Sequence, residues 1–328
     1  MIDKIIEYTA VIRTLGTAGL KYRTLLESLV RQTIHPSKIL VYIAEGYPIP
    51  QYKVTGMQYI YVKKGMVAQR ALHYSEVETE YILFLDDDLY LPDNFVENMW
   101  MLLLKKQADV ISPDIYKHNT CSFVRRFTMA VSGRMISRAN DRKWGYKVMR
   151  NAGFSYNANP TQNVYWSQTN AGACFLCKKE DFLKIHFEDE LWMDNSVYAL
   201  GEDQAMYYKM YLSGLKQLTL FHTGIRHLDA GTSMVNVEKE KMLIYSDFRF
   251  KTIFWHRFIY LPETSLFMRL WSFICIFYTF LFSLSVSLLK LRYDILKIKL
   301  SAIRDGIIFL KSESYKALPK IVENIHYV

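Results

Sequence analysis

The chain has 328 residues, enough to bury a sizeable core in one large or two modest domains, and its 51% hydrophobic and 22% charged residues exclude an intrinsically disordered protein. The formal net charge is +9, and from Glu240 to the end 13 Lys and Arg face 7 Asp and Glu. This basic quarter carries no nucleic-acid-binding motif and its neighbouring sequence is apolar, so it favours an anionic lipid surface over nucleic acid as its partner.

Apolar runs alternate with helical or turn segments through the first 85 residues. Strands are predicted at about Thr9–Thr14, Ile39–Ile43, Gln58–Val62 and Ile82–Leu85, the last of them after a helix around Ala68–Val77. This alternation predicts an α/β domain with a mainly parallel sheet, in which ligands bind beyond the carboxyl ends of the strands. Residues 1–21 are charged and lack an apolar core segment, so no signal peptide is expected.

Three consecutive aspartates, Asp86, Asp87 and Asp88, end the last of these strands. Their carboxylates repel one another unless a positive group lies among them, and a divalent cation with oxygen ligands is the natural candidate. If that cation also holds phosphates, the protein handles a nucleotide. The alternative is a polar strand end that leads into the turn at residues 91–93. The same edge of the sheet is expected to hold two further candidate site elements, Arg13-Thr14 and Glu45.

After a further strand predicted at Asp109–Pro113, residues 116–166 show no clean periodicity. This stretch is either a lid or acceptor-facing loop, or a solvated surface insertion, and it holds the basic residues Arg125, Arg126, Arg134, Arg138, Arg142, Lys143, Lys147 and Arg150. Cys174 and Cys177 have redox or metal spacing, but positions three apart in a strand point to opposite faces. They are therefore predicted to be packing residues, and the sparse use of cysteine suggests a reducing compartment.

The C-terminal quarter contains an uncharged run of 20 residues, Leu270–Leu289, long enough to span a bilayer core of about 30 Å. Basic residues flank both ends of this predicted helix. Four hydroxyls recur on one of its faces: Ser272, Thr279, Ser283 and Ser287. The run either spans the bilayer once or lies in the membrane without crossing it, and the second is favoured. A basic amphipathic helix follows, which fits an anionic leaflet or, alternatively, packs on the α/β domain or in a dimer; its apolar stripe is Leu296, Leu300, Ile303, Ile307 and Leu310.

The segment EYILFLDDDLYLPDNFVENM resembles the Asp-x-Asp region of family 2 glycosyltransferases, which are inverting sugar transferases with the GT-A fold. Upstream, the first strand, the segment LLESLVRQTIHPSKILVYIAEG and the turn Gly65–Ala71 are similar to the opening of that family. Downstream, Gly201-Glu202-Asp203-Gln204 resembles its Glu-Asp motif, which opens a helix ending near Ser213-Gly214. The pieces come in family order and cover residues 8 to about 235.

The resemblance implies a nucleotide-sugar donor and a divalent metal ion, manganese or magnesium. Asp86 would face the nucleotide ribose or the metal, and Asp88 would hold the metal directly. His227 lies where GT-A enzymes often place a late metal-contacting histidine, although a solvated loop histidine is the alternative. Asp87 is expected to point away from the donor.

The resemblance also implies that Asp203 is the general base and that Glu202 binds acceptor hydroxyls, with capping of a helix start as the alternative. Thr14 is predicted to contact the donor. Glu45 matches the second of two acidic positions that recognise the base, but the first is Ala44, a departure that leaves the base open. Arg70 would meet a diphosphate oxygen or the base, or else lie on a helix surface.

These observations predict a GT-A (α/β, Rossmann-like) catalytic domain over residues 1–240 and a helical, membrane-associated region over 241–328. The predicted function is inverting, metal-dependent sugar transfer to a glycan hydroxyl, on a lipid-linked acceptor in surface polysaccharide biosynthesis. The expected location is the cytoplasmic face of the cell membrane, with membrane lipids as partners. Two alternatives stay open: transfer to a polyprenyl phosphate, which needs no base, and a non-catalytic nucleotide-sugar-binding membrane protein.

Overall fold

The computed structural model describes residues 6–115, 122–124, 127, 143–157, 160–196, 198–228 and 236–321. Its strands are β1 (Tyr8–Thr14), β2 (Lys38–Ala44), β3 (Met57–Val62), β4 (Tyr81–Asp86), β5 (Leu89–Tyr90), β6 (Val110–Pro113), β7 (Trp144–Val148), β8 (Phe154–Tyr156), β9 (Val164–Ser167), β10 (Cys174–Lys178), β11 (Gln217–Leu220) and β12 (Arg226–His227). Its helices are α1 (Leu20–Val30), α2 (Phe95–Lys106), α4 (Lys179–Leu183), the 3-10 helix η1 (Phe187–Asn195), α5 (Glu202–Leu212), α6 (Val237–Phe254), the π-helical turn η2 (Trp255–Tyr260), α7 (Leu266–Leu289), α8 (Tyr293–Lys311) and α9 (Glu313–Lys316).

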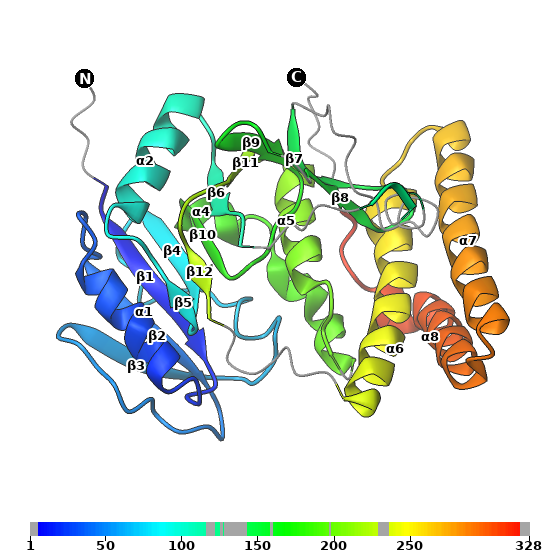
Figure 1. Cartoon of the computed structure of the whole chain (residues 1–328), viewed down its shortest axis with the longest axis horizontal. Helices are drawn as coiled ribbons and strands as arrows, with labels where there is room; N and C mark the ends of the chain where they lie inside the picture. The colour runs from blue at the N-terminus through cyan, green and yellow to red at the C-terminus, as the bar shows by residue number, and fades with distance from the viewer. Residues whose placement is uncertain are drawn as a thin grey trace.

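Among the described residues, one sheet of 10 strands has the order β3-β2-β1-β4-β10-β6-β11-β9-β7-β8 (Figure 1). Strands β1 to β4 run parallel to their neighbours in this group, β6 runs parallel to β11, and β10 lies antiparallel between β4 and β6. The mainly parallel sheet and the strands predicted before residue 114 are confirmed. The carboxyl ends of β1, β2 and β4 therefore meet at one edge, where the aspartates follow.

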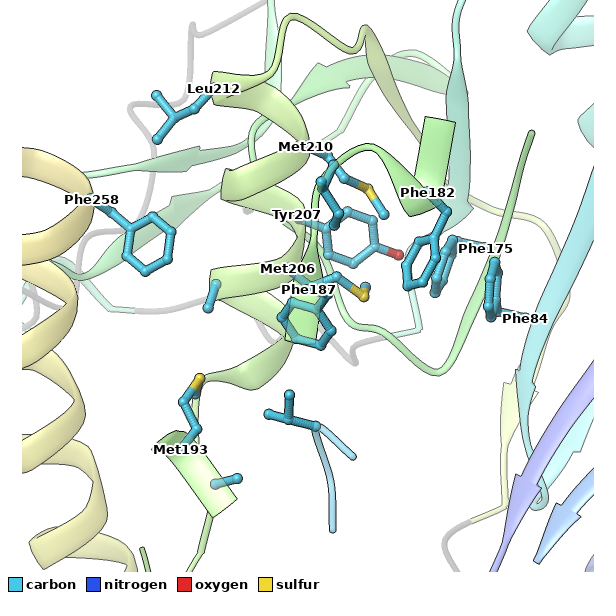
Figure 2. Close-up of a cluster of buried hydrophobic side chains, with 14 of the residues drawn as sticks. Phe84, Phe175, Phe182, Phe187, Met193, Met206, Tyr207, Met210, Leu212 and Phe258 are labelled. Carbon is cyan, nitrogen blue, oxygen red and sulfur yellow. The ribbon is translucent and has the colours of Figure 1, made fainter. Parts of the chain in front are cut away.

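Alternate strand residues enter two separate hydrophobic layers, one on each face of the sheet. Leu83 and Leu85 of β4 pack with α1 and α2, whereas Phe84 packs with α4, η1 and α5. Figure 2 shows this second layer, in which the rings of Phe84 and Phe175 stack with their centroids 4.3 Å apart. Cys174 belongs to the first layer and Cys177 to the second, which confirms that the two sulfurs diverge.

The helix predicted around Ala68–Val77 is wrong, because residues 66–77 form turns and irregular segments. The carboxylate of Asp194 accepts hydrogen bonds from the backbone N–H groups of Val67 (3.0 Å) and Ala68 (2.8 Å). Tyr74 then adopts the left-handed conformation, with φ of 49°, which ends any helical path. A partner more than a hundred residues away fixes this turn, so local propensity did not indicate it.

The stretch without periodicity contains three short strands, β7, β8 and β9, which the sequence did not predict. They extend the sheet beyond β11 and owe their conformation to pairing, since each has five residues or fewer. Five of the basic residues named above lie outside the described residues, so the choice between a lid and a surface insertion stays a prediction: Arg125, Arg126, Arg134, Arg138 and Arg142.

Helices α6, α7 and α8 gather on the side of the molecule away from α1 and β3 (Figure 1). Phe254 and Phe258 belong to the same hydrophobic layer as Tyr207 of α5, and Phe258 points towards that helix (Figure 2). Glu190, fully buried, accepts hydrogen bonds from Arg257 (2.8 Å to Nη2) and Lys209 (3.1 Å). The boundary near residue 240 stays a prediction, but the helices after it share a core with the α/β domain.

Candidate active site

The register of β1 and β4 brings the first aspartate against an arginine. Arg13 and Asp86 are direct neighbours in adjacent parallel strands, and Arg13 Nε lies 2.5 Å from Asp86 Oδ1. The next carboxylate, Asp87, accepts a hydrogen bond from the hydroxyl of Thr14. The third, Asp88, lies 3.1 Å from Nε2 of His227. Each carboxylate thus has its own partner, which answers the repulsion expected within the triplet.

Asp87 is a partly buried carboxyl with a shifted pKa. Burial raises the pKa of Asp87 to about 6; the hydrogen bond from Thr14 opposes the rise, while the charges of Asp88 and Asp86 add to it. A carboxyl with this pKa carries a proton part of the time near neutral pH. The Thr14 hydroxyl also accepts a 2.7 Å hydrogen bond from the backbone N–H of Gly16, so it connects the ends of β1 and β4 to the following turn.

A small two-stranded ribbon places His227 beside Asp88. β12 pairs antiparallel with β5 in the register His227↔Leu89, and the backbone N–H of Leu228 donates to Asp88 O at 2.7 Å. The side chain of Asp88 is 7% exposed and that of His227 is 32% exposed. Among the described residues, no group of three or more His, Cys, Asp and Glu side chains is arranged to hold a metal ion. Asp88 and His227 bring together two side chains of types that ligate metal ions, with 3.1 Å between Oδ1 and Nε2.

A buried ion network lies behind this edge. Glu202 Oε1 is 3.2 Å from Arg13 Nη1 and 3.1 Å from Arg70 Nη1, and Arg70 also contacts the carboxylate of Asp203. A second nitrogen of Arg70 donates to the carbonyl of Gly172 at 2.6 Å. Arg70 is 2% exposed, so it is a central member of this network and not the surface arginine considered as the alternative.

Two glycines make room for the network. A Cβ on Gly172 would overlap both the Asp203 carboxylate and the Arg70 guanidinium. Gly201 directly precedes α5 with φ of 90°, and a Cβ there would overlap the ring of Phe250. Both positions need glycine for space, and Gly201 needs it for backbone conformation as well, which fixes where the first turn of α5 presents its acids.

The pKa values of the two neighbouring acids of α5 are shifted in opposite directions. Burial raises the pKa of Glu202 to about 8; Arg70 and Arg13 oppose the rise, and the charge of Asp203 adds to it. Burial also acts to raise the pKa of Asp203, but Arg70 and the other hydrogen bonds of the network outweigh it, and that pKa falls well below its usual range. Asp203 is therefore the ionised member of the pair, with a side chain 32% exposed against 3% for Glu202.

A cavity of about 900 Å³ opens beside Asp203. Its walls come from β7, β8, the start of α5, α6, the end of α7 and the start of α8; the polar and charged lining residues include Asn170, Asp203, Gln204, Glu240, Asp247, Lys251, Lys290, Arg292 and Lys299. Glu202 is not among the lining residues. Its predicted contact with acceptor hydroxyls stays a prediction, and its observed contacts favour a role in positioning Arg13 and Arg70.

Seven of the eight predicted site residues lie together, in the two connected groups described above: Thr14, Arg70, Asp86, Asp88, Glu202, Asp203 and His227. Glu45 follows β2 at the same edge and is exposed, and among the described residues no side-chain hydrogen bond or ion pair joins it to the others. Sequence reasoning did not predict the ion pairs of Arg13 or the backbone hydrogen bonds accepted by Asp194. The strand-end position of Arg13 was a signal, whereas nothing local marks Asp194.

The model of the family described as "Glycosyl transferase family 2" matches residues 43–181 of this chain. The matched region includes the aspartate triplet and the turn that carries Arg70, and it confirms the predicted family resemblance and the GT-A fold. No curated protein matches the chain. Among solved structures, the chain is similar to the crystal structure of GalNAc-T7 with UDP, GalNAc and Mn²⁺, at 12% identity and a TM-score of 0.48. That match covers 78% of this chain and 50% of the other.

Proposed function

From the family 2 glycosyltransferase domain that this chain carries, we propose an inverting transfer of a sugar from a nucleotide-sugar donor to a hydroxyl of a glycan acceptor. One observation carries the proposal: an ionised carboxylate, Asp203, lies between a donor-type edge with three aspartates and a cavity large enough for a saccharide. Both halves of a transfer reaction thus have a place on either side of one candidate base.

In this reaction the acceptor hydroxyl attacks the anomeric carbon from the face opposite the diphosphate. The bond from that carbon to the acceptor oxygen forms as the bond to the diphosphate oxygen breaks, and Asp203 takes the hydroxyl proton. The nucleoside diphosphate leaves and the configuration inverts. Arg13 and Arg70 lie close enough to the edge to offset negative charge on the leaving group.

The donor end of the site is assigned to residues at the carboxyl ends of β1, β2 and β4. Asp86 and Thr14 would contact the ribose side of the donor, Glu45 the base and Arg70 a diphosphate oxygen. The exposed position of Glu45 next to Ala44 supports contact with a base at the rim of the site.

A divalent ion, manganese or magnesium, fits the donor set at Asp88 and His227, since such ions in nucleotide enzymes take few protein ligands and complete their coordination with phosphates and water. When bound, the ion neutralises the diphosphate and makes it a better leaving group. The 3.1 Å approach of an imidazole nitrogen to a carboxylate oxygen supports this choice, because both atoms are ordinary metal ligands already brought together.

We further propose that the acceptor is lipid-linked and that the enzyme lies on the cytoplasmic face of the cell membrane, in surface polysaccharide biosynthesis. Among the described residues, α7 is the one helix long and apolar enough to cross a membrane by length and composition. Its middle and the segments on either side of it are held against the folded body: Asn151 donates to Thr279 (3.0 Å), Arg150 pairs with Glu263 before the helix (3.3 Å) and Arg292 after it pairs with Glu240 (3.2 Å). These contacts support a helix that lies in one leaflet over a helix that spans the bilayer.

Replacement of Asp203 by Asn tests the proposal. The amide has nearly the same size but cannot take a proton, so turnover should fall by at least about 10²-fold. Binding of a nucleoside diphosphate with manganese should be retained, as measured by calorimetry after a panel of nucleotide sugars has identified the donor. Wild-type turnover by the variant would favour the polyprenyl-phosphate alternative, and donor binding without any turnover in the native enzyme would favour the non-catalytic one.

A further inference from the structure

Helix α7 has its polar face towards the protein and its apolar face outward. The predicted hydroxyl face is the buried one, with Ser272 fully buried, Thr279 7% exposed and Ser287 4% exposed. Large apolar side chains on the opposite face are about half exposed or more: Leu266, Phe267, Leu270, Phe273, Ile274, Phe277 and Leu281. A helix on the surface of a soluble protein buries its apolar face and exposes its polar face. Helix α7 does the reverse, so this pattern fits a helix whose outer side meets lipid.

The apolar surface continues into the turn between α7 and α8, and there it meets positive charge. Leu289 and Leu291 are 81% and 69% exposed, and they alternate with Lys290 and Arg292. Both cations line the cavity that contains Asp203. Next to the cavity, lipid-compatible side chains thus alternate with cations, the arrangement found where proteins meet lipid head groups.

Most charges within the cavity have counter-charges. Lys251 pairs with Asp247 (2.6 Å), Arg292 pairs with Glu240 (3.2 Å), and Asp203 is held by Arg70. Lys290 makes no ion pair among the described residues. It adds positive charge to a wall that already contains a cation.

That second cation is Lys299, which is 9% exposed. Its Nζ donates to Ser283 O (3.0 Å), Ser283 Oγ (2.9 Å) and Ser287 Oγ (2.8 Å), all neutral oxygens on the inner face of α7. The buried hydroxyls thus hold an ammonium group in the cavity wall. Together with Lys290, this ammonium group makes that wall of the cavity favourable to an anion that enters the same space.

We propose that this cavity is the acceptor site and that its Lys290 and Lys299 side takes the diphosphate linkage of a lipid-linked saccharide. The inference rests on the proposed function and specifies its acceptor. The lipid chain leaves over Leu289 and Leu291 into the membrane, the diphosphate lies at the two lysines, and the sugar extends into the cavity towards Asp203. The anionic linkage and the lipid chain are thus recognised by the C-terminal helices, apart from the donor edge.

Farnesyl diphosphate, a short lipid diphosphate, serves as the probe for the full-length protein in detergent, with farnesol and inorganic diphosphate as comparisons in metal-free buffer. Farnesyl diphosphate should bind at least about tenfold more tightly than either comparison, because it alone combines chain and charge. Lys290→Glu should weaken its binding by about tenfold or more. Lys297→Glu is the matched control, since Lys297 is an exposed lysine of α8 that does not line the cavity, and it should bind as wild type.

The outcomes separate this inference from the function it rests on. Equal binding of farnesyl diphosphate by wild type and Lys290→Glu overturns the site, as does equal loss in Lys290→Glu and Lys297→Glu, which indicates general attraction to the surface. Nucleoside diphosphate binding with manganese is measured in all three proteins. If it persists while lipid diphosphate binding is absent, the acceptor site is wrong and the transferase stands; if it is absent in wild type, the proposed function itself fails.

Discussion

At the scale of single residues, each aspartate of the triplet contacts a different partner. Asp86 forms an ion pair with Arg13, Asp87 accepts a hydrogen bond from Thr14, and Asp88 lies beside His227. The sequence alone indicates that a positive group is needed near the triplet. It does not indicate that an arginine directly across the sheet supplies it, because that depends on the register of β1 against β4.

Replacement of Asp88 by Ala should abolish the metal dependence of donor binding. The variant loses the carboxylate that, with His227, is assigned to the metal, whereas the contacts of Asp86 and Asp87 remain. Calorimetry with a nucleoside diphosphate, with and without manganese, measures the effect. Asp93→Ala is the control, since Asp93 is a mostly exposed aspartate beyond the site. An unchanged enhancement by manganese in Asp88→Ala would remove Asp88 from the metal site.

The raised pKa of Glu202 predicts a pH dependence of stability. The folded state binds a proton at Glu202 up to about pH 8, well above the usual range of a glutamate, so the unfolded state binds fewer protons between about pH 5 and 8. The contribution of Glu202 to the free energy of unfolding is therefore fully present at low pH and is lost as the pH rises through 8. Urea unfolding of the ligand-free protein at pH 6 and pH 9 should show a larger loss in wild type than in Glu202→Gln, which cannot titrate. Parallel losses would contradict the assignment.

At the scale of elements, predictability follows the range of the interactions. Strands β1, β2, β4 and β6 are apolar runs buried on both faces, and such runs are recognisable in the sequence. The turn at residues 66–77 depends on Asp194, and the strands β7, β8 and β9 depend on pairing partners, so neither has a local signal. The site follows the same rule: the residue types at the strand ends were predictable, but the Arg13, Arg70 and Glu202 contacts needed the fold.

The attachment of the C-terminal helices depends on a buried ion cluster, and its disruption should destabilise the whole protein. Arg257 of η2 binds both oxygens of the fully buried Glu190, and Lys209 of α5 binds the same carboxylate. Replacement of Arg257 by Ala leaves the buried carboxylate with less positive charge, which should cost roughly 3–5 kcal/mol of unfolding free energy. Denaturant unfolding checks this against Arg304→Ala, an exposed arginine whose loss should cost about 0–1 kcal/mol.

The same cluster bears on how the chain can be divided. Because Phe254, Phe258 and Arg257 all pack against α5 or η1, removal of everything after residue 240 would uncover part of the core around Tyr207. A change in oligomeric state or solubility after such a truncation would therefore report unfolding as well as loss of a membrane contact. Surface substitutions on α7 separate the two effects.

At the scale of the whole molecule, membrane attachment should depend on one face of one helix. Leu270, Ile274, Phe277 and Leu281 recur at spacings of 4, 3 and 4 and form a stripe opposite the buried hydroxyls, each of them 46–57% exposed. Apolar surface gains about 25 cal/mol per Å² on leaving water, and salt does not weaken that contribution, whereas it screens the attraction of the flanking lysines and arginines. Wild type should therefore stay in the membrane fraction after a high-salt wash.

Replacement of these four residues together by Gln should release the full-length protein into the soluble fraction. Glutamine keeps the helix, and the inner face that holds Asn151 and Lys299 is unchanged, so nucleoside diphosphate binding should persist while action on a lipid-linked acceptor falls. Leu20→Gln with Val30→Gln, two exposed apolar residues at the ends of α1, is the control and should leave partitioning as in wild type. Fractionation followed by calorimetry gives both readouts. The outer face of α7 is not the attachment surface if wild type is soluble without detergent. The same holds if the quadruple variant sediments with the membranes as wild type does. The acceptor would then need no lipid.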